Sequence, residues 1–323
     1  MTHKKIVKIT ASAVLFCLLS LFQPQVLSET SSAGRNLTFF LLGDTHYGLN
    51  ENTTAYNRAV IDEINALPGT PYPEAVLTGT VKTPRGVVVL GDLVEHGHKK
   101  IGLKEWEEYT RDFGVVGEGR ISFPVYEGFG NHDGGLEHGI RQLIKNRNSQ
   151  RPGLAHISKN GFHYSWNWEG IHFIQLNLFP GTMADKIPNP LDLPLEGSWR
   201  EPLHSLKFLR ADLKKHLHTK KQPVILFMHF GFDPWGFYWW SNRERKVFYK
   251  VIKNYHVVAI FFGHTHVVQS VKWKGIPTFC VGSIQKKKRP GEFMVVNIIK
   301  NKIYVLERQI DFWGNVYKVK FNN

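Results

Sequence analysis

Five short polar segments each follow a run of apolar residues, and this arrangement limits how the chain can fold. The segments are 43–46 (GDTH), 91–97 (GDLVEHG), 130–133 (GNHD), 228–232 (MHFGF) and 263–266 (GHTH). Buried parallel strands read as continuous apolar runs, and open α/β sheets collect ligands outside the carboxyl ends of their strands. We therefore expect the five segments to converge on one pocket.

The side chains at these strand ends are suited to binding metal ions. They are Asp44, His46, Asp92, Asn131, His132, His229, His264 and His266. A mixture of oxygen and imidazole ligands favours Mn, Fe or Zn, whereas a set of oxygens alone would favour Mg or Ca. None of these segments contains cysteine, which excludes a thiolate site there.

The number of ligands predicts two divalent ions and a hydrolytic reaction. A carboxylate such as Asp92 has two oxygens and can bridge two cations. Two metals about 3.5–4 Å apart clamp a phosphoryl oxygen and lower the pKa of a shared water. We expect a metal-bridging hydroxide to act as the nucleophile. His132, between Asn131 and Asp133, is the candidate to give the leaving oxygen a proton or a positive neighbour.

The order of these motifs resembles that of the calcineurin-like metallophosphoesterases over about residues 37 to 310. The resemblance implies an α/β fold with two packed mixed β-sheets flanked by helices, an αββα sandwich. It also implies two triads of ligands joined by a bridging Asp92, namely Asp44, His46 and His266 for one metal and Asn131, His229 and His264 for the other. His132 would be the catalytic histidine, with Asp133 as its candidate partner.

One position departs from the family pattern. Many members have GDxxDxG where this chain has GDLVEHG, so that Glu95 replaces an Asp that usually lies outside the metal ligands. We expect this change to have little effect.

The first residues form a separate unit. Lys4, Lys5 and Lys8 precede an apolar stretch from about Ile9 to Phe22, which is typical of a secretory signal. This stretch is shorter than the ~20 residues that span a bilayer, so we expect cleavage rather than an anchor. The prediction is a signal peptide over residues 1–28, a single domain over 29–323 and a secreted or periplasmic protein.

Composition fits a single enzyme domain that acts on anions. Of the two cysteines only Cys280 remains after cleavage, which excludes an intramolecular disulfide. The formal charge of +14 loses three lysines with the signal and becomes +11. A positive protein attracts anionic substrates, so we expect a small-molecule or lipid phosphate ester as the substrate. Nucleic acid is possible as a substrate but is not favoured over these esters. The sequence does not specify an oligomeric state.

Apolar periodicity predicts alternating strands and helices followed by a strand-rich tail. Strands are expected over 37–44, 86–92, 123–129, 162–168, 171–178, 223–229, 257–263, 267–273, 277–282, 292–299 and 302–310. Helices are expected over 54–67, 104–113, 136–147, 203–217 and 243–254, with a proline-bearing loop over 179–203.

Two further segments leave alternatives open. The aromatic run WGFYWW (235–240) either lines the substrate site or packs a loop onto the body. KKKR (286–289) is either a basic turn or a phosphate contact, and with the net charge it keeps a nuclease or cyclic-nucleotide phosphodiesterase as an alternative. A non-catalytic glycan- or lipid-binding protein on the same fold is an alternative of another class.

Ten histidines between residues 96 and 256 do not follow the ligand pattern, and we interpret most of them as surface or packing residues. They are His96, His98, His138, His156, His163, His172, His204, His216, His218 and His256.

Overall fold

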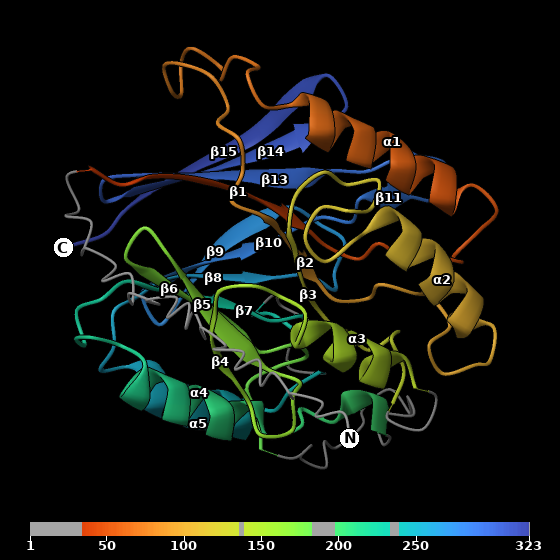
Figure 1. Cartoon of the computed structure of the whole chain (residues 1–323). Helices are drawn as coiled ribbons and strands as arrows, with labels where there is room; N and C mark the ends of the chain where they lie inside the picture. The colour runs from red at the N-terminus through yellow and green to blue at the C-terminus, as the bar shows by residue number, and fades with distance from the viewer. Residues whose placement is uncertain (1–33, 136–138, 183–197, 233–238, 323) are drawn as a thin grey trace, which may run out of the picture.

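The computed structural model of the chain describes residues 34–135, 139–182, 198–232 and 239–322. Two β-sheets lie face to face in the middle of the molecule, and helices cover the outer side of each (Figure 1). This αββα arrangement confirms the predicted fold class. The predicted signal peptide lies outside the described residues.

The first sheet has six strands in the order β15-β14-β13-β1-β2-β3. Their bounds are Asn36–Leu42 for β1, Val87–Leu90 for β2, Val125–Gly128 for β3, Phe293–Ile299 for β13, Lys302–Gln309 for β14 and Phe312–Lys320 for β15. Strands β1, β2 and β3 run parallel, whereas β13, β14 and β15 add an antiparallel meander to the β1 edge.

The second sheet has seven strands in the order β4-β5-β6-β7-β8-β10-β9. Their bounds are Leu154–Ile157 for β4, Tyr164–Trp168 for β5, Ile171–Gln175 for β6, Val224–Phe227 for β7, Val257–Phe262 for β8, Gln269–Trp273 for β9 and Ile276–Cys280 for β10. Strands β6, β7, β8 and β10 are parallel, and the outer strands pair antiparallel. A small hairpin joins β11 (Gln285–Lys286) to β12 (Arg289–Pro290).

Helices lie on both outer faces of this pair of sheets (Figure 1). Their bounds are Thr53–Ala66 for α1, Gly102–Asp112 for α2, Ile140–Asn148 for α3, Ser205–Lys215 for α4 and Asn242–Ile252 for α5. Helices α1 and α2 lie on the first sheet, and α4 and α5 on the second. No helix in the described ranges is long and apolar enough to cross a membrane.

Side chains alternate between two layers of the core, because successive residues of a strand face opposite sides of its sheet. In β1, Phe39 points between the sheets, where its ring meets Phe173 and Phe227 at centroid distances of 5.6 and 6.3 Å. The next residue, Phe40, belongs to the layer beneath the helices. Both faces of the central strands are therefore buried, which explains their continuous apolar sequences.

Four strands and one helix start differ from the sequence prediction. The prediction lacks the short hairpin strands β11 and β12 and the edge strands β4 and β15: β4 is half exposed, and β15 alternates apolar residues with lysine and asparagine. The helix expected over 136–147 begins at Ile140, and residues 136–138 lie outside the described ranges.

Candidate metal centre

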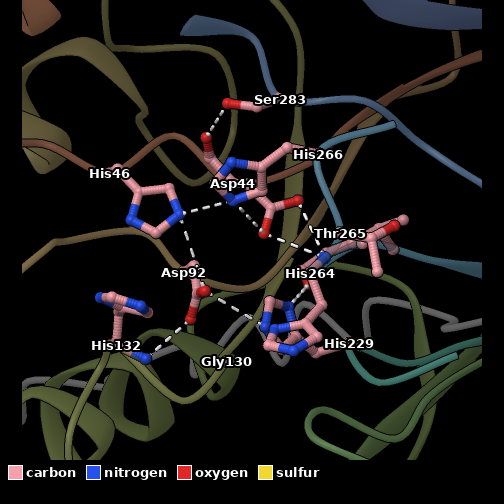
Figure 2. Close-up of polar contacts among 12 residues, drawn as sticks. Asp44, His46, Asp92, Gly130, His132, His229, His264, Thr265, His266 and Ser283 are labelled. Atoms are coloured by element: carbon pink, nitrogen blue, oxygen red, sulfur yellow. Dashed lines mark hydrogen bonds and ion pairs between the residues drawn. The ribbon is translucent and has the colours of Figure 1, made fainter. Parts of the chain in front are cut away.

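The five polar segments meet at the carboxyl ends of strands from both sheets. Strands β1, β2 and β3 lead into Asp44, Asp92 and Asn131, and β7 and β8 lead into His229 and His264. The side chains of Asp44, Asp92, His229 and His264 point toward one another (Figure 2). The arrangement follows from the parallel order of these strands, which places their carboxyl ends at the same edge.

Three overlapping clusters of potential ligand atoms occupy this site. They are Asp44, His46 and His266; His46, Asp92 and His132; and Asp92, His229 and His264, with the atoms of each cluster within 4.8 Å of one another. Asp92 belongs to two clusters and lies between the others. The structure thus brings all seven predicted ligand residues to one site, with Asn131 Oδ1 3.0 Å from His229 Nε2.

Several of these residues have a backbone conformation that non-glycine residues rarely adopt. The φ angles are 54° at Asp44, 41° at His46, 50° at Asp92, 76° at His264 and 57° at His266. Left-handed conformations cost of order 1–3 kcal/mol each and persist where the surrounding structure enforces them. Five of them in one site turn the side chains sharply away from their strands and toward a common centre.

Gly130 lets the backbone pass close beneath the centre. A Cβ atom at this position would lie 2.2 Å from Asp92 Oδ1 and 2.7 Å from His229 Cε1. The buried guanidinium of Arg141 donates to the Gly130 carbonyl at 3.2 Å and lies over the Phe129 ring at 4.4 Å. Glycine is therefore required here for steric reasons.

Backbone amides orient the two carboxylates. The amide of His132 donates to Asp92 Oδ1 at 2.8 Å, and the amide of His264 donates to both oxygens of Asp44 at 3.0 and 3.1 Å. Asp92 Oδ2 then lies 3.2 Å from His229 Nε2 and 3.7 Å from His46 Nε2. These contacts fix Asp92 in a position to bridge two cations.

His229 supplies the sharpest test of whether a cation fits. Its Nδ1 lies 2.8 Å from the Leu90 carbonyl, which can only accept, so Nδ1 carries a proton. Its Nε2 faces two further oxygens, Asp92 Oδ2 and Asn131 Oδ1. A nitrogen lone pair and two oxygens facing one another require a proton or a metal ion between them. The donor set therefore fits a metal.

His46 has a similar orientation. Its Nδ1 lies 2.6 Å from Glu95 Oε2, and its Nε2 lies 3.0 Å from His266 Nε2. Hydrogen bonding of the outer ring nitrogen to a carboxylate is the usual way in which proteins orient a metal-binding histidine. Glu95 therefore orients His46 toward the centre, a role that the sequence analysis did not give it.

Glu95 also contacts His132. Its Oε2 lies 3.4 Å from His132 Nδ1, and its backbone carbonyl lies 3.2 Å from the same atom. Burial opposes ionisation of Glu95, but the hydrogen bonds from His132 and His46 prevail and lower its pKa to about 2. Burial likewise opposes the charge on His132, yet Asp92 and Glu95 raise its pKa to about 10.

Asp133 is the partner that the sequence suggests for His132, but its carboxylate contacts backbone amides. Its Oδ1 accepts from the amides of Leu93 and Val94 at 2.9 and 3.1 Å, and its Oδ2 accepts from Gly130 at 2.7 Å. The side chain is fully buried and joins the second polar segment to the third. Burial, followed by the charge of Asp92, raises the pKa of Asp133 to about 7. The carboxylate that pairs with Nδ1 of His132 is that of Glu95.

The charges of the cluster are balanced by shared protons in the metal-free protein. Burial opposes the charge on both Asp92 and His229, but their attraction lowers the pKa of Asp92 and raises that of His229 to about 9. Burial and the nearby His229 lower the pKa of His264 to about 3. His264 is therefore a neutral imidazole, the form that binds metals.

The aromatic run divides between the two predicted roles. Trp240 is fully buried, and its ring lies 5.8 Å from that of Phe248, so this residue packs the loop onto the body. Trp239 is partly exposed, and its ring meets His264 edge-on at 4.2 Å, directly beside the centre. Residues 233–238 lie outside the described ranges. Trp239 is the member of the run in a position to contact a substrate.

The basic segment 286–289 lies in the β11–β12 hairpin. Lys286 Nζ donates to the carbonyl of His266 at 2.8 Å and pairs with Glu292 at 2.6 Å. Lys287, Lys288 and Arg289 are exposed. The hairpin is thus attached to one of the candidate metal ligands and carries three exposed cations.

Comparison with known proteins agrees with the family resemblance of the sequence motifs. The model of the calcineurin-like phosphoesterase family matches residues 37–268, more than half of the chain. A search of curated proteins finds no match.

Solved structures show the same fold at low sequence identity. A dimetal phosphatase from Danio rerio is 13% identical, with a TM-score of 0.60, and the match covers 88% of this chain and 99% of that one. GAP50, the anchor in the inner membrane complex of Plasmodium, is 15% identical, with a TM-score of 0.52 and coverage of 89% and 90%. The chain belongs to the calcineurin-like phosphoesterase family and is a metal-dependent phosphoester hydrolase.

Proposed function

We propose that this protein is a secreted hydrolase of phosphoric mono- or diesters that depends on two divalent metal ions. The observation that carries the proposal is the inward orientation of His229, whose Nε2 faces oxygens of Asp92 and Asn131 while its Nδ1 is held by a backbone carbonyl. The site has nitrogen and oxygen donors without sulfur, which favours Mn, Fe or Zn.

The contacts divide the donors into two groups with Asp92 between them. Asp44, His46 and His266 would hold one ion, and Asn131, His229 and His264 would hold the other, with Asp92 shared. When bound, such a pair of ions polarises the phosphoryl oxygens and lowers the pKa of a water molecule to near neutrality.

The remaining side chains supply positive charge and a proton. Just over a third of the His132 side chain is exposed, and its ring lies 4.7 Å from that of His46 at the edge of the cluster. In the metal-free protein, Asp92 and Glu95 keep this imidazole protonated at neutral pH. His132 can therefore stabilise the charge that develops on the leaving oxygen and then donate its proton to it. Asp133 joins the loops after β2 and β3 through its hydrogen bonds to their backbone amides.

The experiment is an ester assay with purified protein after removal of metals. We expect no turnover of p-nitrophenyl phosphate or bis(p-nitrophenyl) phosphate until Mn, Zn or Fe is added. Asp92→Asn and His264→Ala should abolish turnover, whereas His218→Ala, outside the centre, should retain it. A folded, metal-loaded protein that cleaves neither ester would overturn the proposal.

Secretion has its own test. The positively charged and apolar start of the chain supports cleavage after residue 28, which would leave the single domain 29–323. Mass spectrometry of the protein from its native host should give an N-terminus near residue 29. A full-length N-terminus in the mature protein would contradict this part of the proposal.

A nuclease or cyclic-nucleotide phosphodiesterase is the second candidate, and the position of the basic hairpin favours it. Lys286 bonds to the carbonyl of His266, and the three residues that follow it in the hairpin, 287–289, are exposed cations. Single-stranded DNA, RNA and cyclic nucleotides should then be cleaved faster than p-nitrophenyl phosphate. Cleavage of small esters without cleavage of these substrates would exclude this candidate.

A further inference from the structure

A second cluster of imidazole and carboxylate groups lies outside the centre described above. It consists of His156 on β4, Asp212 on α4 and His216 at the end of α4. The potential ligand atoms of these residues lie within 4.8 Å of one another. The buried neighbour His172 stands near the start of β6, whereas the metal centre gathers at the carboxyl ends of the strands. The two clusters are therefore distinct.

The local structure brings these three residues together. Asp212 and His216 are four positions apart, so they lie on the same face of the helix. His156 Nδ1 lies 2.9 Å from Asp212 Oδ1, and the rings of His156 and His216 stack at 4.5 Å. Two imidazoles and one carboxylate thus converge from two elements that are separate in the sequence.

The carboxylate is held firmly from behind. Asp212 is fully buried, and its Oδ2 lies 2.6 Å from His172 Nε2. The Ser165 hydroxyl donates to Oδ1 at 2.8 Å. This support resembles the hydrogen bonds that orient the ligands of metal sites in proteins. It fixes the oxygen that faces the His156 imidazole.

One nitrogen of the cluster lacks a partner. Among the described residues, the buried Nε2 of His216 has no hydrogen-bond partner. Leaving a buried polar atom unpaired destabilises the folded state, so such an atom calls for an explanation. The cluster is reachable from solvent at His156, because this residue lines a surface pocket of about 270 Å³.

We propose that His156, Asp212 and His216 form a mononuclear zinc site. Two nitrogens and one carboxylate oxygen are a common zinc ligand set, and a water from the pocket side would complete the tetrahedron. The ion would join β4, a short edge strand, to α4. It would thus stabilise the outer part of the second sheet and take no part in ester hydrolysis.

The test measures bound zinc per chain in the full-length protein after dialysis, by elemental analysis. We expect His216→Ala and His156→Ala each to bind one zinc ion fewer than the wild type. His218→Ala is the matched control, because this neighbouring histidine is exposed and lies outside the cluster. It should bind as much zinc as the wild type.

A second measurement separates this site from the dinuclear centre. In an Asp92→Asn, His264→Ala background, cobalt should still give the visible absorption of a tetrahedral ion, and His216→Ala should abolish it. Circular dichroism verifies that each variant is folded. Unchanged zinc content in the folded His216→Ala variant, or no cobalt spectrum in the double variant, would overturn the proposal. Neither result depends on ester hydrolysis.

Discussion

At the scale of single residues, Glu95 is the clearest case in which geometry changes the interpretation of the sequence. One of its oxygens lies 2.6 Å from His46 and 3.4 Å from His132, so it orients a proposed ligand and stabilises the charge of the proposed acid. We expect Glu95→Ala to lower kcat/KM by about 10–100-fold, the usual cost of removing such a partner. Glu95→Asp should restore part of this loss.

The pH profile distinguishes this role from a merely structural one. Without Glu95 the pKa of His132 falls from about 10, because one of the carboxylates that raise it is gone. The alkaline limit of activity should therefore move to lower pH in Glu95→Ala. Glu51→Ala, which removes an exposed carboxylate, is the control. An unchanged profile in the Glu95 variant would contradict the assignment.

His229 predicts that metal binding releases protons. Despite burial, the charge of Asp92 and the hydrogen bond to it raise the pKa of His229 to about 9, so the metal-free protein holds this proton at pH 7. A cation must displace it. Metal affinity should therefore increase as pH rises toward 9 and fall toward acid pH. Calorimetric titration in buffers of different ionisation enthalpy measures the released protons, and their absence would contradict the proposed role of His229.

At the scale of secondary-structure elements, the sequence predicts the strands that lead to the site but misses one edge strand of each sheet, β15 and β4. The runs before Asp44, Asp92 and His264 are continuously apolar because both of their faces are buried. Edge strand β15 has one exposed face and a weak pattern. The partner of His132 could not be found from the sequence either, because it depends on the left-handed turn at Asp92, which directs the following loop.

Glu127 makes a prediction about β3 and α3. This fully buried carboxylate pairs with Arg147, at 2.7 Å, and with Arg151, which together join the strand to the end of the helix and the loop beyond it. Removing one partner leaves buried charges uncompensated, which costs about 3–5 kcal/mol. We expect Glu127→Ala to lower the free energy of unfolding by this amount in denaturant titrations, while Glu51→Ala has little effect.

The pH dependence of this network has a defined sign. Burial opposes ionisation of Glu127, but the two arginines prevail and hold its pKa below the usual value. Its contribution to stability is therefore fully present above the pKa of glutamate in the unfolded chain, and it is lost as pH falls through the lower folded value. The wild type should lose stability more steeply than Glu127→Ala on acidification. Parallel curves would show that the pair contributes no pH-dependent stability.

At the scale of the whole molecule, the metal centre lies where the two sheets meet. Asp44, Asp92 and Asn131 follow strands of the first sheet, whereas His229 and His264 follow strands of the second. Metal ions bound by these residues would therefore link the two halves of the sandwich as well as support the chemistry. If the predicted signal peptide is removed, Cys280 is the one cysteine left, so no intramolecular disulfide would link the two sheets.

Metal removal should consequently destabilise the whole fold. A ligand that binds only the folded state at 100 times its Kd adds about 2.7 kcal/mol to the free energy of unfolding. We expect a chelator to lower the melting temperature of the wild type and re-addition of metal to restore it. In Asp92→Asn, most of the change in melting temperature between metal-loaded and chelator-treated protein should vanish, because the shared carboxylate is lost. A smaller effect of zinc at the His156 cluster should remain. Equal melting temperatures with and without metal in the wild type would show that the cations do not join the sheets.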